Sequence, residues 1–190
     1  MRWPVVVLVG YVLVGLQMGL GEFTRLGYTT AVPSLIIPFV VFVALLAPTL
    51  GAMWTALLLG VTIDLASPRG PSGVIIAGPH ALGFLLATYL VITVRPIMMR
   101  RNPLTLMVLS IFASALAQLV VVAIFSFRSV YPDPFAWYPV RELIERMLGS
   151  LYTGATGLLL AFVLFPMMPV FGFHDSRGGG SGQRPLGRRP

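Results

Sequence analysis

Long apolar segments, separated by short clusters of Gly, Pro and charged residues, dominate the sequence. The first, Trp3 to Leu20, contains no charged residue and is about as long as a helix that crosses a bilayer core. A second uncharged stretch extends from Leu26 to Ile63. Its strongly apolar part, from Ala31, would form a helix about 50 Å long, whereas the hydrocarbon core is about 30 Å thick. The length therefore predicts two helices in this stretch.

Proline marks the break between these two helices. Pro48 lacks an amide donor and clashes with the preceding turn, so we place the turn around Ala47 to Gly51. The second helix then runs from about Thr49 to Leu65. Pro33 and Pro38 lie early in the first.

Three further apolar segments follow. Ser72–Val94 is interrupted by Gly78-Pro79, so it either kinks there or begins its regular helix at Pro79. The other two are Leu104–Phe125 and Leu143–Phe165. The pattern predicts an all-α integral membrane protein with about six transmembrane helices. Residues 1–170 would form this domain, and residues 171–190 a basic, Gly/Arg-rich, disordered cytoplasmic tail.

Composition supports membrane integration. The chain is 57% hydrophobic and 10% charged, whereas soluble domains carry roughly 25% charged residues. The absence of Cys excludes disulfides and thiolate chemistry. No cofactor is indicated.

The distribution of Arg predicts the topology. With six spans, Arg2, the Arg95–Arg101 loop and the tail share one side, which the positive-inside rule assigns to the cytoplasm. Both termini would then be cytoplasmic. A five-span arrangement, with Leu26–Ile63 crossing once, also satisfies the rule if the N-terminus lies outside. We expect Arg95, Arg100, Arg101 and the tail to contact anionic lipids rather than nucleic acid.

Asp64 is the most informative polar residue, because a carboxylate at the edge of the hydrocarbon is costly and often functional. It could cap a helix end by accepting amides of the following turn. Alternatively, it could pin this corner to another helix or to a partner protein. Candidate partners within the chain are Arg69, His80 and the polar stripe Ser110/Ser114/Gln118. Ion-coupled transport is less favoured, because no second charge lies inside a span.

Catalysis and metal binding have little support. Gly70-Pro71-Ser72-Gly73 matches the short Gly-x-Ser-Gly motif of rhomboid-type intramembrane proteases, which also need a His base from another helix. His80 lies on the same segment and His174 in the tail, so a turn is the better interpretation and an intramembrane serine protease is a remote alternative. No spacing typical of a metal site occurs.

Two sets of small residues could allow close helix packing or contact with a partner helix. One is the pair Gly15 and Gly19 in the first span. The other is Gly149, Thr153 and Gly157 in the last.

The region from Pro33 to Arg101 resembles the MreD family, small multi-pass proteins of the bacterial rod-shape (elongation) machinery. That family has a central Gly-x-x-x-Asp-Leu, a small-residue turn, a Gly, and a helix ending in Ala-Tyr-Leu or similar. Counting forward from Asp64 makes Gly73 the family glycine, whereas counting back from Tyr89 makes it Gly78. The matching residues are Gly60, Asp64, Leu65, Ser67, Gly73 or Gly78, His80-Ala81-Leu82 and Ala87-Thr88-Tyr89-Leu90.

The resemblance implies a non-enzymatic scaffold in the bacterial inner membrane. Such a protein binds MreC, a single-span protein, and so links the MreB cytoskeleton to the peptidoglycan glycosyltransferase and transpeptidase pair. It also implies a six-helix fold similar to the substrate-binding S-components of energy-coupling-factor transporters. A vitamin-binding transporter subunit is therefore the alternative function. Its site would use polar groups on the outer side: Asp64, Arg69, Tyr131, Asp133 and Trp137.

Overall fold

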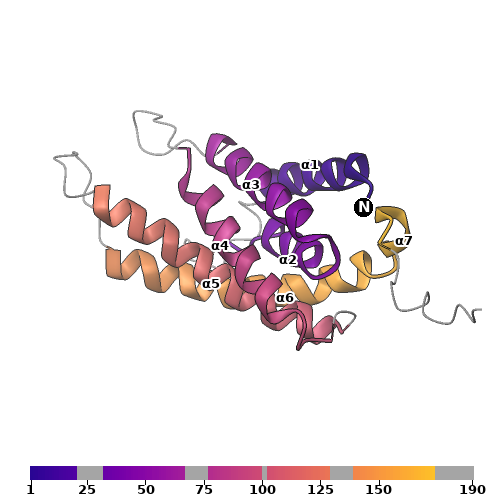
Figure 1. Ribbon diagram of the computed structural model, residues 1–190. Coiled ribbons are helices and arrows are strands. Elements are labelled where there is room, and N and C mark those ends of the chain that lie inside the picture. Colours follow the sequence, from indigo (N-terminus) through magenta and orange to yellow (C-terminus); the bar gives the residue numbers. More distant parts are fainter. Residues whose placement is uncertain (21–31, 67–76, 100–101, 129–138, 174–190) are drawn as a thin grey trace, which may run out of the picture.

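The computed structural model describes residues 1–20, 32–66, 77–99, 102–128 and 139–173 of the 190-residue chain. In this part the secondary structure is entirely helical (Figure 1). The helices are α1 (Trp3–Leu20), α2 (Ile36–Leu46), α3 (Thr49–Ala66), α4 (Pro79–Val94), α5 (Pro103–Arg128), α6 (Pro139–Leu164) and α7 (Met168–Phe171).

The helix boundaries agree with most of the sequence pattern. Two helices, α2 and α3, share the long uncharged stretch, and α3 ends one residue later than expected. The turn between them is shorter than expected, because Gly51 already lies in the first turn of α3. Pro33 precedes α2 instead of lying within it. The regular helix after the Gly-Pro interruption begins at Pro79, so the second of the two alternatives for this segment is confirmed.

Helix α2 is the centre of the bundle. It packs against α1, α3, α4, α5 and α6, and every residue from Ile36 to Leu45 is buried. All residues of α2 are apolar, which is compatible with burial on every side. Its 11 residues extend only about 16 Å, so its two ends lie within the span of the longer helices around it.

Polar side chains from other helices cap both ends of α2. At the N-terminal end, Gln17 Oε1 accepts hydrogen bonds from the backbone amides of Leu35 (3.0 Å) and Ile36 (3.3 Å). At the C-terminal end, the Arg95 guanidinium donates to the carbonyl oxygens of Ala44 (3.3 Å) and Ala47 (2.9 Å). These contacts matter because unpaired backbone groups at helix ends cost several kcal/mol in hydrocarbon, and because a cation is favourable at a helix C-terminus.

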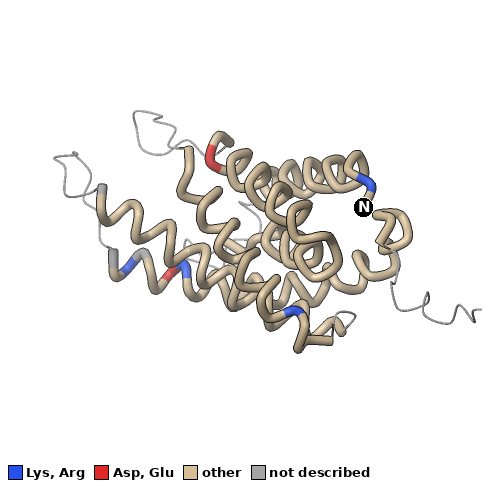
Figure 2. The backbone as a smooth tube through the Cα atoms, in the orientation of Figure 1, with Lys and Arg blue, Asp and Glu red and all other residues tan. Residues whose placement is uncertain are grey.

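Four of the described helices are long and apolar enough to cross a membrane. Their candidate spans are Trp3–Leu20, Thr49–Ala66, Pro103–Phe127 and Leu143–Leu164. Helices α2 and α4 are apolar but shorter. In the part of the chain drawn in Figure 2, charged residues lie towards the helix ends and leave the middle of the bundle uncharged. The described part of the chain is therefore all-helical, and its four long apolar helices fit a membrane protein.

The first and last described helices meet at one end of the bundle. The Arg2 amide donates to the carbonyl oxygen of Phe171 at 2.8 Å, and the terminal ammonium lies 3.5 Å from the carbonyl oxygen of Gly172. Figure 1 shows the start of α1 beside α7. The described chain thus starts and ends at the same end of the bundle.

Candidate functional site

The candidate site is the corner where the C-terminal end of α3 meets the N-terminal end of α4. Gly60 and Asp64 are four residues apart, so both lie on the face of α3 that is turned towards α4. A Cβ atom on Gly60 would lie 2.4 Å from Ala81 Cα and 2.9 Å from the His80 carbonyl oxygen. Gly60 thus allows a backbone-to-backbone approach that no larger residue permits.

Asp64 holds the first turn of α4 through its backbone amides. Its Oδ2 accepts hydrogen bonds from the amides of Gly78 (2.8 Å) and Ala81 (3.2 Å), and the His80 amide lies 3.1 Å from both carboxylate oxygens. The first amides of a helix have no partner inside the helix and form its positive end. Asp64, from one helix, is therefore the N-terminal cap of the next.

The His80 side chain completes the corner. Its Nδ1 lies 2.7 Å from Asp64 Oδ1, and the two side chains are 8% and 0% exposed. When Asp64 is ionised its carboxylate only accepts hydrogen bonds, and the contact then requires the proton on Nδ1. The ring packs edge-on against Phe84, with centroids 6.2 Å apart. Among the three partners considered for Asp64, the structure brings His80 to it.

Gly78 has a defined role in this corner. It is the residue before the first turn of α4, with φ +127°, a value that L side chains rarely adopt. Its amide is one of the donors to Asp64. Gly73, the other candidate for the motif glycine, lies outside the described residues.

Other motif residues do not join the corner. Leu65 and Tyr89 point away from the bundle, with 54% and 59% of their surfaces exposed. The remaining positions named for this site or its alternatives lie outside the described residues. They are Ser67, Arg69, Ser72, Arg100, Arg101, Tyr131, Asp133, Trp137 and the tail from His174.

The polar stripe on α5 faces α6 rather than Asp64. Ser114 Oγ bonds to Ser150 Oγ at 3.1 Å, and Gln118 Oε1 accepts from Arg146 Nη1 at 2.7 Å. A Cβ on Gly157 would lie 3.0 Å from Ser110 Oγ. The stripe thus packs two neighbouring helices together.

The two small-residue sets differ in what they contact. Thr153 is buried and its Oγ1 accepts the Ser34 amide at 3.0 Å, and a Cβ on Gly149 would lie 3.5 Å from the Val32 carbonyl oxygen. With Gly157 against Ser110, the face of Gly149, Thr153 and Gly157 is filled by this chain's own segments. In contrast, no described atom would lie within 4 Å of a Cβ on Gly15 or Gly19.

Several structurally important residues did not stand out in the sequence. A Cβ on Gly83 would lie 2.9 Å from the Ala117 carbonyl oxygen, so α4 and α5 also approach closely. Gln17 and Arg95, which cap α2, offered only the signal of a polar residue within or beside an apolar run. From the sequence, Arg95 was expected to contact lipids. In the structure its guanidinium bonds to Thr49 Oγ1 at 3.3 Å, in addition to the carbonyls of α2.

The chemistry of the corner is that of a helix joint. The carboxylate and Nδ1 are bonded to each other, and Asp64 also accepts three backbone amides. The described residues contain no group of three or more His, Cys, Asp or Glu that could hold a metal ion.

No family model matches the chain, and neither curated proteins nor solved structures match it.

Proposed function

We propose that this protein is a non-enzymatic membrane scaffold of the MreD type. The observation that carries the proposal is that Gly60, Asp64, Gly78 and His80 together connect α3 to α4. All four are among the residues on which the resemblance to that family rests, with Gly78 as one of its two candidate glycines. Their contacts join two helices instead of opening towards a substrate. A motif that builds a rigid joint suits a protein whose task is to hold partners in place.

In this proposal the chain crosses the inner membrane six times, with both termini in the cytoplasm. An even number of crossings is supported by the hydrogen bond between Arg2 and Phe171, which keeps the first and last described helices at one end. Helices α2 and α4 would be the two short crossings. The six-helix arrangement would correspond to the S-component fold that the resemblance implies.

The proposed partner is an MreC-like single-span protein, through which the scaffold connects MreB to peptidoglycan synthesis. Since the Gly149–Thr153–Gly157 face is occupied within the bundle, α1 is the better candidate for contact with that partner's helix. Leu8 and Val12 of α1 are 65% and 59% exposed.

The alternative of a vitamin-binding transporter subunit is less well supported. Asp64 was to supply a polar group for the ligand, but its oxygens accept the amides of α4 and the His80 ring. It therefore has little capacity left to bind a substrate.

Affinity purification and depletion test the proposal together. We expect the tagged full-length protein to recover a single-span protein with a large extracytoplasmic domain, and depletion to turn rod-shaped cells round. A Gly60→Leu variant should neither recover the partner nor restore the rod shape of depleted cells. Leu65→Val, on the outward face of the same helix, should do both. If the wild-type protein recovers no such partner and depleted cells keep their shape, the scaffold proposal is wrong.

A further inference from the structure

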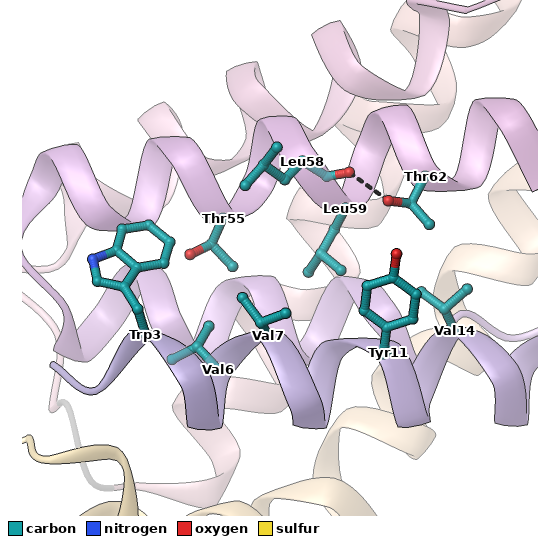
Figure 3. Close-up of a pocket in the computed structure, with 9 residues that line it drawn as sticks. All are labelled: Trp3, Val6, Val7, Tyr11, Val14, Thr55, Leu58, Leu59 and Thr62. Atoms are coloured by element: carbon teal, nitrogen blue, oxygen red, sulfur yellow. Dashed lines mark hydrogen bonds between the residues drawn. The ribbon is translucent and has the colours of Figure 1, made fainter.

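An elongated groove lies between α1 and α3. It has a volume of about 170 Å³, and Figure 3 shows its walls. It is lined by Trp3, Val6, Val7, Tyr11, Val14, Thr55, Leu58, Leu59 and Thr62. On α1 the lining extends from Trp3 to Val14, a length of about 16 Å at 1.5 Å per residue.

The two helices run in the same direction along the groove. Near its start, a Cβ on Gly51 of α3 would lie 3.9 Å from the Trp3 ring. Further along, a Cβ on Gly10 would lie 3.1 Å from the Leu59 side chain. The groove therefore follows the helix axes, which is also the direction of the acyl chains in a bilayer.

The lining is mostly hydrocarbon, and its polar groups are the Tyr11 hydroxyl, the Trp3 indole N–H and two threonine hydroxyls. Thr55 and Thr62 are its two threonines, and their hydroxyls donate to the carbonyl oxygens of Gly51 and Leu58, each at 2.8 Å. Both hydroxyls are thus used within α3, as the dashed line in Figure 3 shows for Thr62. A helix with its side chains is about 10 Å across, and a volume of about 170 Å³ is too small to hold one, whereas a single acyl chain is a much thinner occupant.

Positive charge lies at one end of the groove. Trp3 forms that end, and Trp is enriched at the level of lipid headgroups. Arg2 directly precedes Trp3 in the chain and is exposed, and its Cγ lies towards Gly172, 3.2 Å from where a Cβ on that glycine would be. At this depth in a bilayer, the negatively charged group that can pair with Arg2 is the phosphate of a lipid headgroup.

We propose that the groove holds one acyl chain of an anionic phospholipid, with the lipid phosphate at Arg2. The apolar wall between Trp3 and Val14 selects a chain, and the cationic end selects an anionic headgroup over a zwitterionic one. This lipid would fill the space between α1 and α3 and thereby support the outermost helix. The site is separate from the Asp64 corner and does not depend on the scaffold proposal.

Native mass spectrometry of the full-length protein in mild detergent tests this site, with phosphatidylglycerol and phosphatidylcholine as the probes. We expect one retained phosphatidylglycerol per chain and weaker retention of phosphatidylcholine. Val7→Phe places extra atoms in the groove and should abolish retention. Val12→Phe adds the same atoms to α1 outside the lining and should leave it unchanged. Arg2→Gln should weaken phosphatidylglycerol binding by about fivefold, the effect of one Arg beside an anionic lipid surface.

Three results would overturn the proposal. The first is equal retention of phosphatidylglycerol by Val7→Phe and the wild-type protein. The second is equal binding of the two lipids with no effect of Arg2→Gln. The third is a wild-type dimer that Val7→Phe converts to a monomer, since the groove would then hold a second copy of the chain. Circular dichroism and thermal unfolding of each variant establish that it is folded.

Discussion

Replacing Gly60 with Ala should separate α3 from α4. The added Cβ would lie 2.4 Å from Ala81 Cα, and carbon atoms pack best at roughly 3.5–4.0 Å, so the helices must move apart by about 1 Å. The Asp64 bonds to the amides of His80 and Ala81 are already 3.1 and 3.2 Å long. A displacement of that size would break both of them.

The size of the effect follows from those bonds. A hydrogen bond to a charged group contributes about 1.5–3 kcal/mol, so losing two removes about 3–6 kcal/mol. Ala has a better helix propensity than Gly by about 1 kcal/mol, which offsets part of the loss. We therefore expect Gly60→Ala to lower the free energy of unfolding by about 2–5 kcal/mol.

Equilibrium unfolding of the purified protein in mixed detergent micelles measures this difference. Gly15→Ala is the matched control, because no described atom lies within 4 Å of its added Cβ. It should be neutral or stabilise the protein by up to about 1 kcal/mol. If Gly60→Ala is as stable as Gly15→Ala, the close approach of α3 and α4 is not what this glycine provides.

Three further substitutions test the remaining contacts by the same unfolding measurement. Asp64→Ala should destabilise the protein by about 3 kcal/mol, since it leaves the buried amides of α4 unpaired, and Asp64→Asn by less because one acceptor remains; equal losses would argue against the capping role. Arg95→Met should lower the free energy of unfolding by about 2 kcal/mol, because it removes the cap of α2, and Arg95→Lys should have an intermediate effect. If Arg95→Met leaves stability unchanged, Arg95 does not stabilise α2 as a cap. Ser110→Ala should change stability by less than about 0.5 kcal/mol, because the buried hydroxyl has no hydrogen-bond partner in the described part; a large loss would reveal one.

The sequence predicted the helix joint more completely than the centre of the bundle. Pro48 and the bilayer thickness were enough to divide the long apolar stretch into α2 and α3. Asp64 stood out because a carboxylate is costly there, and His80 was among its candidate partners. Neither argument could choose between His80, Arg69 and the α5 stripe, because that choice depends on which helices are neighbours.

The burial of α2 could not be predicted from its residues. An apolar helix in a membrane protein has the same composition whether it contacts lipid or protein, so hydropathy carries no information about its position. The small-residue sets present the same problem. Gly149–Thr153–Gly157 and Gly15–Gly19 have equal spacing, yet the first is filled by the chain's own atoms, whereas no described atom would lie within 4 Å of a Cβ on either glycine of the second.

The capping of α2 has a consequence for how the protein is made. Gln17 precedes α2 in the chain, but Arg95 follows it by about 50 residues and Thr153 is 119 residues beyond Ser34. When a ribosome has released only the first three helices, the carbonyls at the C-terminal end of α2 still lack their partner. A chain that ends before Arg95 therefore leaves these carbonyls uncapped, and one that ends before α6 also lacks the bond between Ser34 and Thr153.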